Sequence, residues 1–318
     1  MENKTILVTG VSGYIGGQTA LMLKDQGYTV FGVDLEKPST EIFNALTGFS
    51  HSDFTDQICL NMIDNTKPDA VIHCAGTSLV GPSILNPEVY YHNNFVKTLI
   101  LLNHLINNGS KTRFIFSSSA AVYGDPIMTP CQEEDPPMPI SPYGESKFMV
   151  EMMLKRYAHA YNIDYVAFRY FNACGADSQG RHGQAPGATH IIARILESIR
   201  DDKEFTLYGK NYSTDDGTCV RDYVHVEDIA QAHILAIDPE VPPGVYNLGS
   251  STGYSNRQII DMAKQVTGIS PKVIDGEPRP GDPAVLTASA DSFNRAAKWE
   301  PGYTLYAMVQ HAWKWYTR

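Results

Sequence analysis

Up to about residue 172, short apolar runs alternate with longer segments in which apolar residues recur every three or four positions. The short runs are rich in β-branched residues and indicate buried strands, whereas the longer segments have the spacing of helices. The expected strands span residues 4–10, 28–34, 69–76 and 113–119, and the expected helices span residues 14–27 and about 87–109. This alternation predicts an α/β fold with a doubly wound parallel sheet, which binds ligands at the carboxyl ends of its strands.

The second half of the chain has a different pattern. Glycine and proline become more frequent, and the helices and strands become shorter and less regular. A helix is still clear after the capping-box pattern of Ser255 and Gln258, and it is expected to end at Gly268. We therefore predict two domains, a larger one over residues 1–172 and a smaller α/β substrate domain over residues 173–318, with some chain crossing between them.

Composition indicates an ordinary globular protein, because 43% of the 318 residues are hydrophobic and 19% are charged. The formal net charge is −10 and no run of Lys or Arg stands out, which disfavours nucleic acid or an anionic membrane as a partner. No apolar stretch approaches the roughly 18–20 residues of a membrane span, and the N-terminus enters a strand pattern rather than a signal peptide. We expect a cytoplasmic protein.

The cysteines and histidines show neither a disulfide pattern nor a metal-binding pattern. The five cysteines lie far apart, without a C-x-x-C pair, at Cys59, Cys74, Cys131, Cys174 and Cys219. Buried thiols in a reducing compartment fit this odd number better than a disulfide framework does. The ten histidines lack a ligand spacing such as H-E-x-x-H, so we expect no metal.

The first expected strand leads into a glycine-rich turn, with Gly10, Gly13 and Gly16 in the order G-x-x-G-x-x-G. Such a turn lets a pyrophosphate approach the backbone at the positive end of the next helix. Tight turns often contain glycines, but here Asp34 also follows at the end of the second strand, about 20 residues further on. A carboxylate there accepts hydrogen bonds from the adenosine ribose and repels a 2′-phosphate, which favours NAD over NADP.

A second candidate feature is the sequence SPYGESKFMVE, at the expected start of a helix. It places Tyr143 and Lys147 four residues apart, so both side chains lie on one helical face and the charge of one acts on the other. Taken alone, this pair also fits a solvated helix surface. Its role therefore depends on the rest of the chain.

Several motifs occur in order over nearly the whole chain, and together they carry a family resemblance. They are the glycine turn, HCAG (73–76), SSSAAVYG (117–124), Tyr143 with Lys147, RYFNACGA (169–176), RDYVHVED (221–228) and RPGD (279–282). The chain resembles the extended short-chain dehydrogenases/reductases and, more narrowly, the UDP-glucose 4-epimerases (UDP-galactose 4-epimerases). The resemblance implies a Rossmann-type sheet that binds NAD, and a UDP-sugar substrate that is oxidised and then reduced at one carbon.

By this resemblance, Tyr143 is the catalytic base, Lys147 holds the nicotinamide ribose, and Ser119 hydrogen-bonds the reacting oxygen. A phenol with a pKa of about 10 needs roughly 4 kcal/mol of preference for tyrosinate to titrate near pH 7. We expect the Lys147 ammonium, about 4 Å away, to supply up to about that much, with help from the positive nicotinamide. Ala120 and Ala121 stand where family dehydratases carry an acidic pair, which disfavours elimination of water.

The resemblance also implies which other residues bind ligands. The cofactor contacts are Gly10, Gly13, Tyr14, Ile15, Gly16, Asp34, Asp53, Phe54, Ala75, Gly76, Asn93, Tyr143, Lys147 and Phe171. The substrate contacts are Ser119, Asn172, His190, Tyr208, Arg221, Arg279, Asp282 and Leu286. Taken alone, Arg221 or Arg279 also fits a solvated surface. The planar guanidinium of arginine, however, can form two parallel hydrogen bonds and suits paired phosphates.

Some positions depart from the family pattern. Leu35 and Glu36 follow the ribose aspartate where the family often has Asn, Ser78 replaces a common lysine near the pyrophosphate, and His190 replaces an asparagine. These changes leave the NAD affinity and the exact sugar open. Leu286 stands where a tyrosine limits the family's pocket to glucose and galactose, so we expect N-acetylated sugars to be accepted as well.

We expect interconversion of UDP-glucose and UDP-galactose through a transient 4-keto sugar. The alternatives are a 4-epimerase of UDP-GlcNAc/UDP-GalNAc or UDP-xylose/UDP-arabinose, or a nucleotide-sugar 4-keto reductase. A non-catalytic NAD-sensing module is disfavoured, because such proteins commonly lose the tyrosine and the lysine. The family also implies a homodimer, with residues 87–108 and 143–161 paired with their copies. Apolar residues of these helices are Leu101, Leu102, Leu105, Met149, Met152 and Met153.

Overall fold

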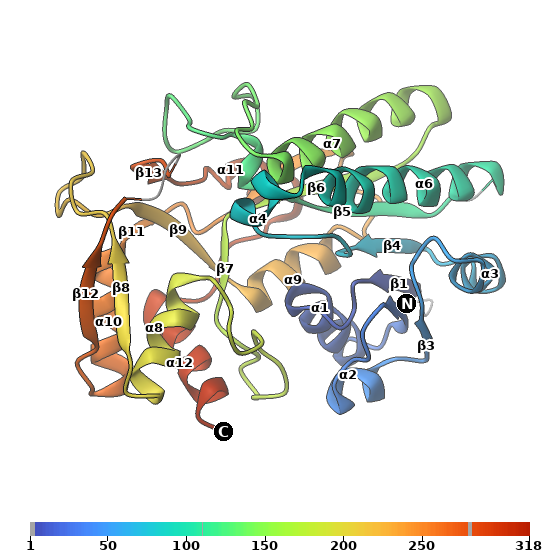
Figure 1. The fold of residues 1–318 in the computed structure, drawn as a ribbon. Coiled ribbons are helices and arrows are strands. Elements are labelled where there is room, and N and C mark those ends of the chain that lie inside the picture. Colours follow the sequence, from blue (N-terminus) through green and yellow to red (C-terminus); the bar gives the residue numbers. More distant parts are fainter. Residues whose placement is uncertain (1–3, 110, 279–281) are drawn as a thin grey trace.

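The computed structural model describes residues 4–109, 111–278 and 282–318. Its largest element is a seven-stranded parallel sheet with the order β10-β6-β5-β4-β1-β2-β3 (Figure 1). The strands span Thr5–Thr9 (β1), Thr29–Asp34 (β2), Gly48–His51 (β3), Ala70–His73 (β4), Arg113–Ser119 (β5), Tyr165–Tyr170 (β6) and Gly244–Leu248 (β10). The strand order reverses between β1 and β4, and doubly wound sheets bind ligands at such a reversal. The predicted fold class is confirmed.

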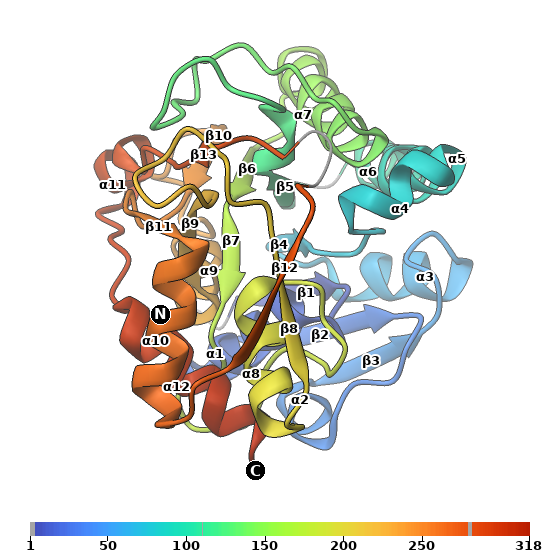
Figure 2. The same cartoon turned by 60° about the vertical axis from the view of Figure 1, so that its left-hand side comes forward.

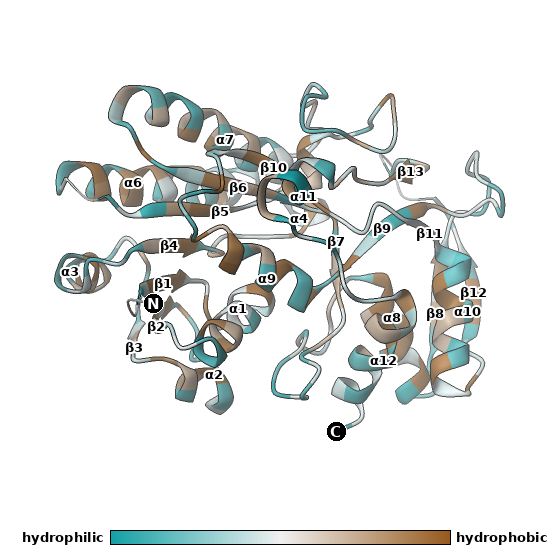
Figure 3. Cartoon of the chain, turned by 180° about the vertical axis from the view of Figure 1, so that it is seen from behind, coloured by the Kyte–Doolittle hydropathy of each residue, from teal (hydrophilic) through white to brown (hydrophobic). Residues whose placement is uncertain are grey.

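Helices cover both faces of this sheet. They span Tyr14–Asp25 (α1), Thr40–Ala45 (α2), Gln57–Thr66 (α3), Val80–Leu85 (α4), Pro87–Tyr90 (α5), Lys97–Asn107 (α6), Pro142–Tyr161 (α7) and Val226–Leu235 (α9). Ile6 and Val8 of β1 pack into the core that contains α1 and α9, whereas Leu7 packs into the core that contains α3, α6 and α7. Because both faces are buried, the strands are continuous apolar runs, and much of β4, β5 and β6 is brown in Figure 3.

The helix expected at residues 87–109 is not uniform. It consists of α5, a π-helical segment η1 (Tyr91–Val96) and α6. A π-helical turn is wider than an α-helical one and often occurs at functional sites. Within η1, Asn94 accepts a hydrogen bond from the amide of Thr77 at 2.7 Å, so the segment contacts the loop that follows β4.

The second half forms smaller sheets with a core of its own (Figure 2). Its strands are Asn172–Cys174 (β7), Glu204–Tyr208 (β8), Val220–His225 (β9), Gly253–Ser255 (β11), Lys272–Gly276 (β12) and Val285–Leu286 (β13). Its helices are Ile191–Arg200 (α8), Asn256–Thr267 (α10), Asp291–Ala297 (α11) and Leu305–Tyr316 (α12). The predicted capping box of α10 is confirmed, because Ser255 and Gln258 exchange hydrogen bonds, and Gly268 ends the helix with a φ of +72°.

Two elements of the second half belong to the large sheet in space. Strand β10 pairs with β6, from Gly244 opposite Val166 to Leu248 opposite Tyr170, and α9 packs against α1. The chain therefore crosses back into its first half before it completes the second.

All five cysteines are free thiols, of which only Cys74 is more than slightly exposed. None of the helices in the described ranges combines the length and the apolar character that crossing a bilayer requires.

Candidate active site

The carboxyl edge of the large sheet and the second half enclose a cavity of about 1050 Å³. Its wall combines the turn after β1, the ends of β4, β5 and β6, the start of α7, and parts of α8, β8, β9 and β13. The predicted ligand residues in this wall are Gly10, Gly13, Tyr14, Ile15, Gly16, Gly76, Ser119, Tyr143, Lys147, Phe171, Asn172, His190, Tyr208, Arg221, Asp282 and Leu286. The fold thus brings members of both predicted ligand sets into one space.

Other predicted residues are not part of this wall. Asp34, Asp53, Phe54 and Ala75 lie at or after the ends of β2, β3 and β4, and Asn93 lies in η1. Arg279 lies outside the described residues.

The glycine turn brings the backbone of β1 close to the start of α1. Gly13 is the N-cap of α1, and its amide donates a hydrogen bond to the carbonyl oxygen of Gly10 at 3.1 Å. A Cβ atom at position 16 would lie 2.2 Å from that oxygen, so the turn requires Gly16. The first turn of α1 contains no acidic side chain, and its free amides fit the pyrophosphate of NAD.

Asp34 is held beside this turn at the end of β2. Its Oδ2 atom accepts a hydrogen bond from the amide of Ser12 at 2.9 Å, and its Oδ1 atom accepts one from the amide of Glu36 at 3.0 Å. These bonds fix the orientation of the carboxylate. Each oxygen retains a lone pair that can accept a ribose hydroxyl.

Asp53 is positioned by Lys97, a residue that the sequence analysis did not identify. Lys97 Nζ lies 2.6 Å from Asp53 Oδ2, and Thr55 donates two hydrogen bonds to Oδ1. Burial raises the pKa of Asp53, but the hydrogen bonds from Lys97 and Thr55 outweigh it, so the net pKa is lowered. Nearby, Asn93 donates to Thr77 Oγ1 at 2.8 Å and helps to hold the loop after β4.

The start of α7 approaches the end of β5 very closely. The helix begins after Ser141, whose Oγ atom accepts a hydrogen bond from the amide of Gly144 at 3.2 Å. A Cβ atom at position 144 would lie 2.4 Å from the carbonyl oxygen of Ala121. Glycine therefore permits the approach that brings Tyr143 next to Ser119.

Lys147 is buried, and its Nζ atom donates a hydrogen bond to the carbonyl oxygen of Ser117 at 2.8 Å. Burial lowers the pKa of Lys147 to about 8. Burial also raises the pKa of Tyr143, and hydrogen bonding with Ser119 opposes this rise only in part. Our expectation that Lys147 lowers the pKa of Tyr143 is therefore wrong for this arrangement. Its ammonium bonds to Ser117 and lies 6.0 Å from the centroid of the tyrosine ring.

A third residue on the same face of α7, Glu151, anchors the helix to the sheet. Tyr143, Lys147 and Glu151 follow one another at intervals of one helical turn. Glu151 forms a buried ion pair with Arg169 of β6 at 2.7 Å and accepts a hydrogen bond from Ser118 Oγ at 2.5 Å. The i, i+4 spacing after Lys147 was the only sequence signal for this role.

On the substrate side of the cavity, Arg221 and Asp282 form an ion pair with each other. Leu286 lies opposite Arg221 in the ladder between β13 and β9, so the predicted sugar-gate residue adjoins the predicted phosphate residue. Asn172 donates its amide hydrogen to the carbonyl oxygen of Asp222 at 2.9 Å. This bond fixes the side chain and leaves its amide oxygen available as an acceptor.

Arg194 and Tyr170 are polar residues of the cavity wall that were not predicted from the sequence. Arg194 of α8 places its guanidinium 5.8 Å from the ring centroid of Tyr208. It follows His190 by one helical turn, and that spacing was a usable signal. Tyr170 ends β6, and its hydroxyl lies 2.6 Å from Nε2 of the buried His233.

Comparisons with known proteins agree with this arrangement. The model of the NAD dependent epimerase/dehydratase family matches residues 6–249. The UDP-glucose 4-epimerase of Halalkalibacterium halodurans is 41% identical over 98% of this chain and 95% of its own length. The crystal structure of UDP-glucose 4-epimerase from Brucella ovis in complex with NAD has a TM-score of 0.92 at 37% identity and covers 98% of this chain and 97% of its own. The UDP-Glc/GlcNAc 4-epimerase from Campylobacter jejuni has a TM-score of 0.85 at 33% identity, with 99% of each chain covered.

Proposed function

The chain belongs to the NAD-dependent epimerase/dehydratase family, and from this we propose that it interconverts UDP-glucose and UDP-galactose through a transient 4-keto sugar. One observation carries the proposal: Tyr143, Lys147 and Ser119 meet in a cavity where Ala120 and Ala121 also form the wall. Oxidation and reduction at one carbon need one proton-transferring group and a hydroxyl that holds the oxygen. Elimination of water would need an additional acid and base, which two alanines cannot supply.

Tyr143 takes the proton of the sugar 4-hydroxyl, while Ser119 hydrogen-bonds the same oxygen. NAD, when bound, accepts the hydride from that carbon and adds positive charge beside the phenol. The Ser117 carbonyl holds Lys147 in place to bind the nicotinamide ribose. Once the ketone had turned over in the cavity and been reduced on its other face, Tyr143 would return the proton to the same oxygen. The same phenol thus acts as base and then as acid.

The two halves of the chain divide the ligands between them in this proposal. Residues 1–172 hold NAD and add Ser119 and Asn172 to the sugar side, and residues 173–318 supply the other UDP-sugar contacts, apart from α9 and β10, which belong to the large sheet. The NAD contacts are Gly10, Gly13, Tyr14, Ile15, Gly16, Asp34, Asp53, Phe54, Ala75, Gly76, Asn93 and Phe171, with Tyr143 and Lys147. The UDP-sugar contacts are Asn172, His190, Tyr208, Arg221, Arg279, Asp282 and Leu286, with Ser119.

Leu286 sets the width of the sugar pocket. It is partly buried against a small apolar cluster that includes Ala120 and Val122. A leucine has no ring or hydroxyl, so an acetamido methyl group can pack against it. A relative of similar fold is named a UDP-Glc/GlcNAc 4-epimerase, which supports the same breadth here. UDP-glucose and UDP-galactose are the main pair, and the N-acetylated pair is a second one.

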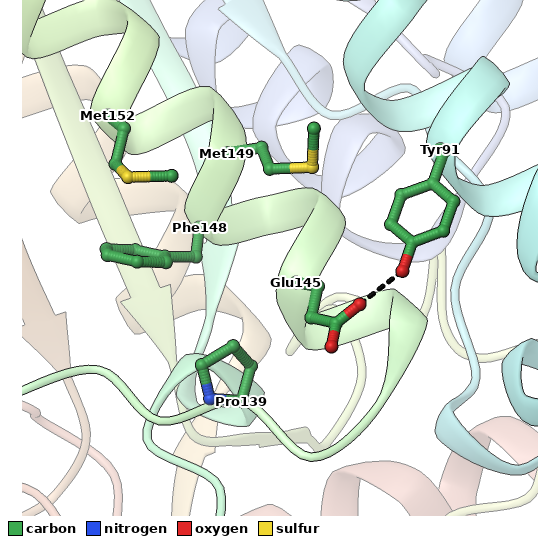
Figure 4. A pocket seen from close by; sticks show the side chains of 6 residues that line it. All are labelled: Tyr91, Pro139, Glu145, Phe148, Met149 and Met152. Carbon is green, nitrogen blue, oxygen red and sulfur yellow. Dashed lines mark hydrogen bonds between the residues drawn. The ribbon is translucent and has the colours of Figure 1, made fainter.

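We also propose that the enzyme is a cytoplasmic homodimer. The free thiols fit a reducing compartment. Of the apolar residues expected at the dimer contact, Leu101, Leu102, Leu105 and Met153 lie in the core instead. The outer face of α7 nevertheless carries a groove of about 470 Å³, lined by Tyr91, Pro139, Glu145, Phe148, Met149 and Met152 (Figure 4). Met152 is 46% exposed there, and Ile100 of α6 is 43% exposed. A second copy would cover these apolar side chains, and light scattering that finds only monomer at micromolar concentration would contradict the dimer.

The reaction is tested with purified protein and a panel of UDP-sugars, without added cofactor. An epimerase regenerates its NAD in every turnover, so we expect UDP-galactose to form from UDP-glucose and the reverse, as followed by NMR of the sugar protons. A 4-keto reductase would instead consume added NADH. If no 4-epimer forms from any UDP-sugar while NAD is bound, the proposed function is wrong.

A further inference from the structure

The cavity wall has a different balance of charged side chains from the chain as a whole. The whole sequence has a net charge of −10, yet the charged side chains among the described residues of the wall are three cations and one carboxylate. They are Lys147, Arg194, Arg221 and Asp282. A wall with this balance attracts an anion.

The contacts of these cations differ. Lys147 donates a hydrogen bond to the carbonyl oxygen of Ser117, and Arg221 forms an ion pair with Asp282. Within the described residues, Arg194 has neither an ion pair nor a hydrogen bond from its guanidinium, although it is half-buried. Of the two described cations that the substrate half adds to the cavity wall, it is the one that no carboxylate pairs with, and a partly desolvated guanidinium of this kind favours an anionic ligand.

The position of Arg194 suits a phosphate. Its guanidinium lies over the ring of Tyr208, and α8 lies beside β8, the strand that carries this tyrosine. This cation–π contact uses none of the guanidinium N–H groups in a hydrogen bond, so they remain available for paired hydrogen bonds to a phosphate. His190 is the N-cap residue of the same helix one turn earlier, and desolvation lowers its pKa, which disfavours its charged form. The fixed positive charge at this end of α8 therefore comes from Arg194, together with the helix dipole.

We propose that Arg194 is a diphosphate-binding residue of the substrate half, which acts beside Arg221 and is held in place by its cation–π contact with Tyr208. This inference rests on the proposed function, because it assigns a contact to the diphosphate of the UDP-sugar. It adds a residue that none of the motifs in the sequence contains. It adds a positive charge for the two phosphates beside Arg221, whose own charge is shared with Asp282, and beside the proposed contact Arg279.

Arg194→Gln tests this role by removing the charge and keeping a polar side chain. Calorimetry on the protein as purified should show that the Kd for UDP rises about 10- to 100-fold, the range of a lost charge-assisted hydrogen bond. The Kd for uridine, measured by competition with UDP, should change less than about threefold, because uridine carries no phosphate. Arg194→Lys should recover part of the UDP affinity, because it restores the charge without the fork. The matched control is Arg257→Gln, which removes an exposed arginine of α10 in the same half and should leave both values unchanged.

Retention of NAD and an unchanged melting temperature show that each variant is folded. If Arg194→Gln changes UDP affinity no more than Arg257→Gln does, Arg194 is not a phosphate ligand. Equal losses for UDP and uridine also overturn the proposal, because Arg194 then supports the base through Tyr208. If the unmodified protein binds no UDP, the proposed function falls, and this inference falls with it.

Discussion

Replacing Glu151 by glutamine tests whether its buried ion pair holds α7 against the sheet. The side chains of Glu151 and Arg169 are 3% and 4% exposed, and Ser118 donates to the same carboxylate. Glutamine keeps the size of glutamate but leaves the Arg169 guanidinium buried without a counter-ion. Removing one partner of a buried ion pair lowers the free energy of unfolding by about 3–5 kcal/mol. This is a large part of the roughly 5–15 kcal/mol that is typical of proteins.

Thermal unfolding followed by circular dichroism measures this cost. At about 2–4 °C per kcal/mol for a large domain, the midpoint of Glu151→Gln should fall by on the order of 10 °C. Turnover should fall as well, because the same helix positions Tyr143 and Lys147.

The control is Asp202→Asn, which breaks an exposed pair with Lys272. These two atoms lie 2.7 Å apart, but the side chains are 84% and 56% exposed. Such an exposed pair contributes about 0–1 kcal/mol to the free energy of unfolding, so the midpoint of thermal unfolding should change by no more than a few degrees. The double change Glu151→Leu with Arg169→Met should recover much of the lost stability, because apolar residues can replace a buried pair. A fall in Glu151→Gln no larger than that of the control would refute this account of α7.

The remaining predictions concern the chemistry. Tyr143→Phe should lower kcat by about 10²- to 10⁴-fold while NAD and UDP-sugar still bind, and near-normal turnover would mean that the base lies elsewhere. Burial lowers the pKa of Lys147 from 10.5 to about 8, so its buried charge destabilises the native state below pH 8, and this penalty disappears between pH 8 and 10.5. Lys147→Met should be inactive, but at pH 7 its free energy of unfolding should exceed that of the parent by at most about 3 kcal/mol. This advantage should shrink by about pH 9.5. A difference in melting temperature that does not vary with pH would contradict the lowered pKa of Lys147. Leu286→Tyr should lower turnover of UDP-GlcNAc about 10- to 100-fold with little effect on UDP-glucose, and equal losses on both substrates would show that Leu286 is not the gate.

Local patterns predicted much of the large sheet and the cofactor turn. Residues 113–119 were expected as a strand, and β5 has these bounds, because a strand buried on both faces needs only a short apolar run. The glycine turn was also predictable. Its requirement, that Gly16 come close to the Gly10 carbonyl, is satisfied within seven residues of the chain.

Contacts between distant segments could not be predicted in this way. Nothing in the sequence around Glu151 identifies Arg169 as its partner, because the pair depends on how α7 crosses β6. The π-helical segment η1 likewise depends on packing against the loop at Thr77. The pKa of Tyr143 was predicted in the wrong direction, because the spacing of the sequence shows a nearby charge whereas the depth of burial is known only from the fold.

The return of the chain to the large sheet has a consequence for protein synthesis. Strand β10 covers one side of β6, but its residues are made some 75 positions after β6 ends. At roughly 5–20 residues per second, a ribosome needs about 4–15 s to translate that stretch. During this interval the hydrogen-bonding groups along one side of β6 have no strand beside them, and an uncovered strand edge attracts other chains. The first half is therefore open to pairing with other chains along β6 until the residues up to Leu248 have been made.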